Sequence, residues 1–207
     1  MPPTVAATTD NAATRLSPRQ ISGPQPLDVR QADGVYYRNA PAHVDEPEVT
    51  SVELLQPTDW HDAVSAAAEH PDAVPVAGGT DVMVELNFDR RRPAALLDLT
   101  RVPELAEWWV ADDGRIRLGA AVTYSRLITE LGDRLPGLAM AARTVGSPQI
   151  RNRGTVGGNL GAASPAGDCH PMLLSDDTEV EVASAAGSRL VPIAEFYLGV
   201  KRNALMA

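Results

Sequence analysis

Glycine is concentrated in one segment of this sequence, and that limits what the segment can build. Residues 146–167 hold six of the sixteen glycines, at positions 146, 154, 157, 158, 161 and 167. Glycine offers no side chain to pack in a core, and ordering it costs conformational entropy. Hydroxyl, amide and carboxylate side chains lie between these glycines up to Asp168. A long stretch without helical or strand periodicity is usually functional. We therefore expect an irregular loop over 151–168 that holds a ligand.

A second glycine turn lies earlier in the chain, at residues 77–81 (AGGTD), between a strand predicted over 73–77 and a helix predicted over 82–87. Two glycines allow positive φ and let successive backbone N–H groups converge on an anion, helped by the start of the helix. The spacing matches neither GxGxxG nor the P-loop. A simple helix cap by Thr80 or Asp81 is the alternative for this turn taken alone.

Hydrophobic periodicity predicts an α+β domain from about residue 50 onward. Strands at 52–54, 73–77 and 95–99 alternate with helices over 60–68 and 82–87, which indicates parallel pairing. Thr58 or Asp59 is placed to cap the first helix, and Thr123 a later one. Further on, the pattern predicts a hairpin of 108–110 with 115–121, helices over 124–131 and 138–145, and a hairpin of 178–183 with 189–193. A new element opens at residues 195–199 and the chain stops eight residues later, so we expect a truncated domain or one that needs a partner.

Residues 1–48 differ from the rest in composition. They carry seven of the 17 prolines and show no sustained period, which favours a disordered N-terminal tail. The domain is accordingly expected over residues 49–207.

Charge and cysteine content exclude several classes of protein. The net charge of −9 argues against binding to nucleic acid or to an anionic membrane surface. The single cysteine, Cys169, rules out an internal disulfide and a four-thiolate cluster within this chain. We expect a buried neutral thiol there, no metal site, and a cytoplasmic protein. Arg151 and Arg153 could neutralise phosphate or face solvent or a partner.

The motifs then point to a family. VAGGTDVMVELN (76–87) and GSPQIRNRGTVGGNLGAASPAGDCHPMLL (146–174) resemble the two FAD-binding stretches of the flavin domain of molybdenum hydroxylases. That domain is the FAD subunit of bacterial xanthine dehydrogenase, and it is similar to the medium subunit of aerobic carbon monoxide dehydrogenase. LLDLTRVPEL (96–105), RIRLGAAVTYSRL (115–127) and EFYLGVKRNAL (195–205) match in the same order.

The resemblance implies a p-cresol methylhydroxylase-type FAD-binding fold. Two α/β subdomains, here 49–105 and 106–207, would hold FAD between them, the second being incomplete because the family domain continues with a C-terminal subdomain. The first turn would wrap the FAD diphosphate, part of the second stretch would form the opposing wall, and a carboxylate would reach the ribose or adenosine end. The residues implied are, in that order, Ala77, Gly78, Gly79, Thr80, Asp81 and Val82; Thr155, Gly157, Gly158 and Asn159; and Asp168.

The resemblance also implies partners and a role, but no catalytic side chain in this chain. A molybdopterin-containing large subunit would oxidise the substrate and a [2Fe-2S] subunit would relay electrons. FAD would collect them and pass a hydride to NAD+, so that this chain is an oxidoreductase subunit. The alternative is a non-catalytic remnant or assembly piece that keeps the loops and no longer holds FAD.

Overall fold

The computed structural model describes residues 30–32, 35–37 and 51–206, and the chain divides into two units, 1–49 and 50–207. In the first unit, strands β1 (Arg30–Ala32) and β2 (Val35–Tyr37) pair antiparallel, with Arg30 opposite Tyr37. The rest of the tail expected over 1–48 lies outside the described residues.

A small parallel sheet opens the second unit, as the alternating strand and helix periods predict. Its order is β3-β5-β4, and both pairings are parallel. Asp59 caps the first helix by accepting a hydrogen bond from the N–H of Asp62 at 2.9 Å, and the helix ends at His70, just before Pro71. The elements are β3 (Glu53–Leu55), α1 (Trp60–Glu69), β4 (Val74–Val76), α2 (Val82–Asn87) and β5 (Ala95–Asp98).

Short helices and two hairpins make up the remainder. Both predicted hairpins are confirmed: β6 pairs with β7 and β8 with β9, each antiparallel. The Thr123 cap is also confirmed, since its hydroxyl accepts from the N–H of Arg126. The elements are η1 (Leu99–Arg101), α3 (Pro103–Ala106), β6 (Trp108–Val110), β7 (Ile116–Leu118), α4 (Tyr124–Glu130), α5 (Pro136–Thr144), α6 (Pro148–Arg153), α7 (Val156–Ala162), α8 (His170–Ser175), β8 (Glu179–Ser184), β9 (Gly187–Pro192), α9 (Ile193–Phe196), β10 (Tyr197–Gly199), β11 (Arg202–Asn203) and η2 (Ala204–Met206).

The prediction of an irregular loop over 151–168 is wrong, because α6 and α7 occupy most of that segment. Each helix has a hydroxyl cap: Ser147 accepts from the N–H of Ile150, and Thr155 from that of Gly158. The helical penalty of the α7 glycines is offset by packing, since Val156 and Leu160 are buried. Residues 154–155 between the two helices and residues 163–169 after them are irregular.

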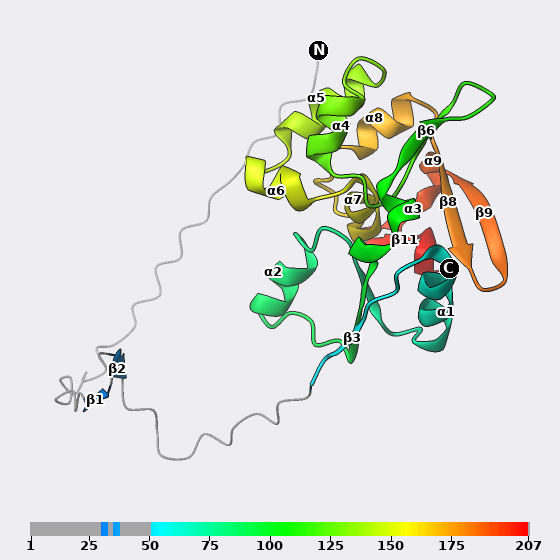
Figure 1. The fold of residues 1–207 in the computed structure, drawn as a ribbon. Coiled ribbons are helices and arrows are strands. Elements are labelled where there is room, and N and C mark those ends of the chain that lie inside the picture. Colours follow the sequence, from blue (N-terminus) through cyan, green and yellow to red (C-terminus); the bar gives the residue numbers. More distant parts are fainter. Residues whose placement is uncertain (1–29, 33–34, 38–50, 207) are drawn as a thin grey trace, which may run out of the picture. The chain divides into compact units, whose positions relative to one another are not determined.

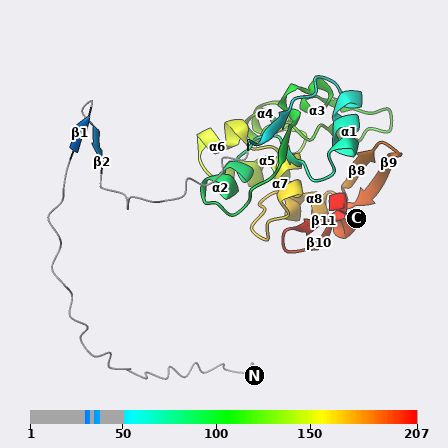
Figure 2. The same cartoon turned by 90° about the horizontal axis from the view of Figure 1, so that it is seen from below.

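The core of the second unit lies among α4, α5, α7, α8 and the end of β9. Leu127, Leu138, Ala139 and Phe196 are almost completely buried there. Helices α4 to α6 lie together on one side of the unit, and the β8–β9 hairpin lies beside α1 on the other (Figures 1 and 2). In the part of the chain that the structure describes, no helix combines the length and apolar character that a membrane span requires.

Candidate functional site

The turn before α2 carries a row of backbone donors. None of the hydrogen bonds formed among the described residues has the N–H of Gly78, Gly79, Thr80, Asp81 or Val82 as its donor. Gly79 has φ +75°, a left-handed conformation that favours glycine and turns the backbone so that successive N–H groups can face one point. Neither Thr80 nor Asp81 caps α2 through its side chain, so the simple-cap alternative is wrong for this turn.

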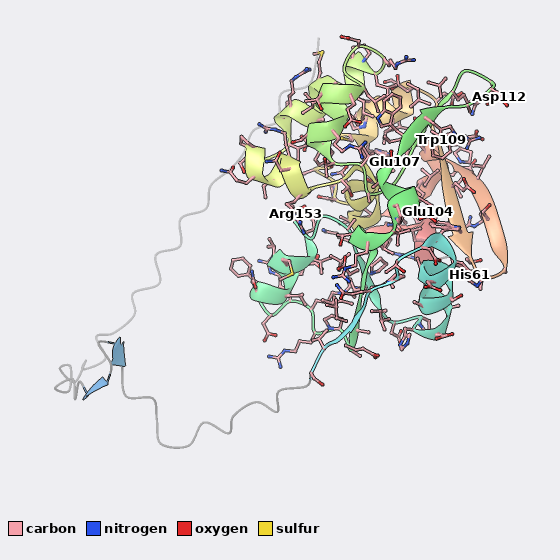
Figure 3. The ribbon with its side chains drawn as sticks, in the orientation of Figure 1. His61, Glu104, Glu107, Trp109, Asp112 and Arg153 are labelled. Carbon is pink, nitrogen blue, oxygen red and sulfur yellow. The ribbon has the colours of Figure 1, made fainter. Side chains whose placement is uncertain are left out.

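The first turn packs directly against the second glycine-rich segment. A Cβ atom added to Gly78 would lie 2.0 Å from the carbonyl oxygen of Arg153 and 2.9 Å from the Cα of Gly154. The two segments predicted to meet are therefore in backbone contact. Figure 3 shows Arg153 at the end of α6, on the side of α2.

A pocket of about 210 Å³ lies where these segments meet. Asp98, at the end of β5, is on its rim. Partial burial would by itself raise the pKa of Asp98, but hydrogen bonds from Thr100 and Gln56 outweigh that effect and lower this pKa below its usual value. The pocket is thus lined by apolar residues together with the Asp98 carboxylate and Arg153. Its lining is Leu54, Val76, Ala77, Gly78, Gly79, Met83, Leu96, Asp98, Thr100 and Arg153.

The N-terminal end of α7 is satisfied within the protein, unlike the turn at 78–82. The N–H of Gly157 donates to Ala120 at 3.1 Å, that of Gly158 to the Thr155 hydroxyl at 2.9 Å, and that of Asn159 to the Thr155 carbonyl at 3.0 Å. A Cβ on Gly157 would lie 2.5 Å from Ala120. Backbone amides for an anion therefore come from the first turn, and these α7 residues shape the second wall.

Asn159 keeps one polar atom without a partner. Its side-chain oxygen is buried and accepts no hydrogen bond in the described part of the structure. Gly167 lies beside it, because a Cβ there would be 3.0 Å from that oxygen. A buried amide oxygen without a donor costs free energy unless a ligand or water supplies one. Asn159 is therefore the α7 residue best suited to contact a ligand.

Tyr124 packs against the second segment, where its N–H donates to the carbonyl oxygen of Gly154 at 3.0 Å. Its phenol is buried, which raises its pKa well above the usual range, and nearby negative charge from Asp168 and Asp81 adds to that effect. Asp168 itself is exposed and accepts a hydrogen bond from the Thr144 hydroxyl at 3.3 Å. Cys169, next in the chain, is a buried thiol as expected, and burial raises its pKa to about 11.

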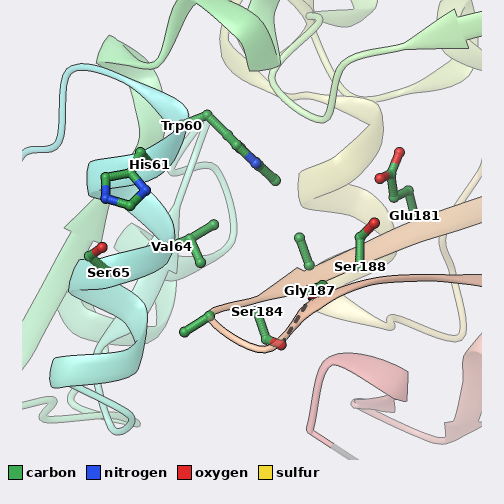
Figure 4. Close-up of a pocket in the computed structure, with 10 residues that line it drawn as sticks. Trp60, His61, Val64, Ser65, Glu181, Ser184, Gly187 and Ser188 are labelled. Atoms are coloured by element: carbon green, nitrogen blue, oxygen red, sulfur yellow. Dashed lines mark hydrogen bonds between the residues drawn. The ribbon is translucent and has the colours of Figure 1, made fainter.

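A larger pocket, of about 370 Å³, lies elsewhere, between α1 and the β8–β9 hairpin. Figure 4 shows His61 and Val64 on the helix side and Glu181 and Ser188 on the hairpin side. It contains none of the residues predicted for the cofactor, and most of its side chains are exposed. Of the residues predicted for the cofactor, Ala77, Gly78 and Gly79 line the smaller pocket, whereas those predicted at 155–159 and 168 do not. We assign the candidate site to this pocket because the 77–82 turn there contacts the backbone of Arg153 and Gly154.

Known proteins of one family resemble this chain over most of its length. The family described as the FAD binding domain in molybdopterin dehydrogenase matches residues 50–207. The chain belongs to this family. A xanthine dehydrogenase FAD-binding subunit of Escherichia coli O157:H7 is 36% identical over 140 residues, covering 67% of the chain and 48% of the relative. The nicotinate dehydrogenase FAD-subunit of Eubacterium barkeri is 33% identical over 162 residues, covering 75% and 54%.

Solved structures of the family share the fold. Carbon monoxide dehydrogenase from Hydrogenophaga pseudoflava superposes with a TM-score of 0.71 at 29% identity, covering 74% of this chain and 54% of that one. Quinoline 2-oxidoreductase from Pseudomonas putida 86 gives a TM-score of 0.71 at 29% identity, covering 75% and 55%. The chain thus spans about half the length of the relatives that it matches.

The residues present fit the family's cofactor, FAD. The five N–H groups at 78–82 can receive a diphosphate, and the Asn159 side-chain oxygen can receive a donor from the ligand. Arg151 serves another purpose, since its guanidinium donates to the carbonyl oxygens of Arg143, Val145 and Gly146 and so caps the end of α5.

Three features of this site could not be assigned from the sequence. The Arg153 carbonyl contacts Gly78, Tyr124 packs against Gly154, and Lys201 reaches the start of α2 with its ammonium group. Tyr124 carried no signal beyond its place on a helix face. Lys201 did carry one, because it is the chain's single lysine.

Proposed function

We propose that this chain holds FAD at the junction of the 77–82 turn with α6 and α7. The observation that carries the proposal is the row of five backbone N–H groups without acceptors in the described structure, at a turn in backbone contact with Arg153 and Gly154. Such a row binds an anion without lysine or arginine. That suits a site in a chain with a net charge of −9.

Each predicted residue has a role in this proposal. Ala77, Gly78, Gly79, Thr80, Asp81 and Val82 wrap the diphosphate through the backbone. Thr155, Gly157 and Gly158 shape the facing wall, and Asn159 contacts the cofactor through its side chain. Asp168 accepts hydrogen bonds from ribose or adenosine hydroxyls. The cofactor would lie between a small subdomain (49–105) and a larger one (106–207), in a p-cresol methylhydroxylase-type fold.

In its complex, we propose, the chain is the flavin component of a xanthine dehydrogenase-like molybdenum hydroxylase of the cytoplasm. When bound, FAD supplies the redox chemistry, taking electrons that arrive from iron–sulfur clusters and delivering a hydride to NAD+. The partners are a molybdopterin-containing large subunit and a [2Fe-2S] subunit. Relatives named as a subunit or a medium chain support this assembly. The remnant alternative is not favoured, because the family match runs through the whole of residues 50–207.

The test is to co-express the full chain with its large and iron–sulfur subunits and to identify the bound cofactor. We expect flavin absorbance in the purified complex and FAD by mass spectrometry of the released cofactor. NAD+ reduction with the complex's substrate then tests the electron acceptor. A complex that releases no FAD and takes up none when FAD is added would refute the proposal.

A further inference from the structure

The turn between β10 and β11 contacts the end of α7 through its backbone. The N–H of Lys201, in this turn, donates to the carbonyl oxygen of Ala163 at 2.9 Å. Both residues are in the left-handed region, Lys201 with φ +56° and Ala163 with φ +44°. Side chains rarely adopt that conformation unless contacts hold them in it. The hydrogen bond therefore keeps the turn at a defined place beside the glycine-rich segment.

A buried amide strengthens the same attachment. Asn203, on β11, is 1% exposed and donates from its side chain to the carbonyl oxygens of Leu160 at 3.3 Å and Gly161 at 2.8 Å. These carbonyls belong to the last turn of α7. The Leu160 carbonyl also accepts from the N–H of Ala163 at 3.1 Å, whereas Asn203 is the one donor to the Gly161 carbonyl among the described residues. The β10–β11 turn is thus fixed to the second wall of the site independently of the Lys201 side chain.

The Lys201 side chain extends to the other wall. Its ammonium nitrogen lies 3.8 Å from a carboxylate oxygen of Asp81 and 3.7 Å from one of Glu85. Both carboxylates are at the start of α2, directly after the row of free N–H groups. One residue therefore joins the two segments of the site, with its backbone on Ala163 and its ammonium group on α2.

Charge gives this bridge a consequence for ligand binding. Asp81 and Glu85 add negative charge beside a turn proposed to receive a diphosphate, and like charges at short range repel. Lys201 pairs with both carboxylates, whereas Arg91 pairs only with Glu85, through its other carboxylate oxygen at 3.7 Å. The ion pairs are about half exposed, so they contribute little to folding stability. The ion pairs instead affect the local electrostatic potential beside the turn and the position of α2.

We propose that Lys201 is a positioning residue of the FAD site, which holds α2 against the end of α7 and neutralises Asp81 and Glu85 beside the diphosphate. The inference rests on the proposed function, because it concerns the affinity of the same site for FAD.

The first test measures FAD affinity in the full chain, with its partner subunits, after flavin removal. Lys201→Met keeps the backbone N–H and the apolar stem but removes the charge. We expect it to weaken FAD binding by about tenfold at low salt while the melting temperature stays near that of the unaltered protein. Lys201→Arg, which keeps the charge, should restore binding.

Arg115→Met is the matched control. It makes the same change in net charge at a distant ion pair, between Arg115 and Glu179 at 2.6 Å, and should leave FAD affinity unchanged. Added salt is the second control, because it screens the exposed carboxylates. The deficit of Lys201→Met should therefore shrink as the salt concentration rises. A merely structural role for the side chain would predict neither rescue by arginine nor this salt dependence.

The outcomes separate this inference from the proposed function. If the unaltered chain binds no FAD, the proposed function fails. If it binds FAD and Lys201→Met binds equally well at low salt, only the role of Lys201 is overturned. Equal weakening by Arg115→Met would also overturn it, because net charge would then account for the effect.

A second measurement needs no variant. Lys201 is the chain's single lysine and its side chain is 46% exposed, so acetylation of the folded, flavin-free chain neutralises one side-chain amine. We expect acetylation at Lys201, confirmed by mass spectrometry, to weaken FAD binding as Lys201→Met does. Reductive methylation retains the charge and should not. Unchanged affinity after complete acetylation would contradict the inference.

Discussion

Gly78 has space for a hydrogen atom where any other residue carries Cβ. The atoms that Cβ would meet are backbone atoms of Arg153 and Gly154, at 2.0 to 2.9 Å, and backbone cannot yield as the end of a flexible side chain can. We expect Gly78→Ala to lower the free energy of unfolding by about 2–3 kcal/mol and to abolish FAD retention, because the two segments must separate. Denaturant unfolding and the flavin content of the purified protein measure both effects.

Gly161→Ala is the control for that prediction. A Cβ at Gly161 would meet only a methyl group of Leu205 at 3.9 Å, and alanine favours a helix over glycine by about 1 kcal/mol. This variant should be as stable as the unaltered chain or more so, and should keep FAD. Equal damage from both variants would show that Gly78 is not a special contact.

A single residue, Cys169, is also expected to make the stability of the folded chain depend on pH. Burial raises the pKa of its thiol to about 11 in the folded protein. In the unfolded chain the pKa of a cysteine thiol is about 8.5. Below about pH 8.5 both states carry the neutral thiol. Above it only the unfolded state releases the proton, so the free energy of unfolding falls as pH rises, by about 2 kcal/mol at pH ~10.5.

Unfolding of the unaltered chain and of Cys169→Ala, each at neutral and alkaline pH, checks this prediction. The variant cannot lose that contribution, so the stability difference between the two proteins should narrow as pH rises. A difference that stays constant with pH would refute the assignment.

At the scale of elements, α7 depends on partners at both of its ends. Thr155 satisfies its first turn, and the buried Asn203 satisfies carbonyl oxygens of its last. We expect Asn203→Ala to lower the free energy of unfolding by about 2–3 kcal/mol, because it leaves the partly buried Gly161 carbonyl without a donor and also removes the acceptor for the N–H of Leu205. Chemical denaturation measures the change.

An exposed asparagine provides the comparison for Asn203. Asn152 accepts one hydrogen bond, from the Ser125 hydroxyl at 2.6 Å, at the surface. Its change to alanine should alter stability by no more than about 0.5 kcal/mol. If both variants lost similar amounts of stability, the burial of Asn203 on β11 would not be the cause of the destabilisation.

At the scale of the whole molecule, the site belongs entirely to one of the two units. Every residue proposed to contact FAD lies within 50–207, the range that the family matches. A compact unit with its own core can fold by itself, so removal of residues 1–49 should leave FAD affinity within about twofold. Titration of both chains with FAD tests this. A large loss of affinity would place part of the site in the first unit.

The sequence by itself determined the local elements of this protein and the family to which it belongs. Asp59 and Thr123 cap helices, and Asp112 to Gly114 turn a hairpin, because these effects depend on residues a few positions apart. The motifs at 76–87 and 146–174 identified the family for the same reason, because each motif is a short continuous stretch of sequence.

Only the tertiary structure decided which groups remain free to act. The helices α6 and α7 form in a glycine-rich segment because packing against α4 and the Ala120 backbone outweighs glycine's weak helical preference. In the same packing, the backbone N–H groups of Gly157 and Gly158 donate hydrogen bonds within the protein, whereas those of residues 78–82 donate none among the described residues. The contacts of Gly78 with Arg153, and of Lys201 with Asp81, join residues far apart in the chain, and no local pattern encodes such proximity.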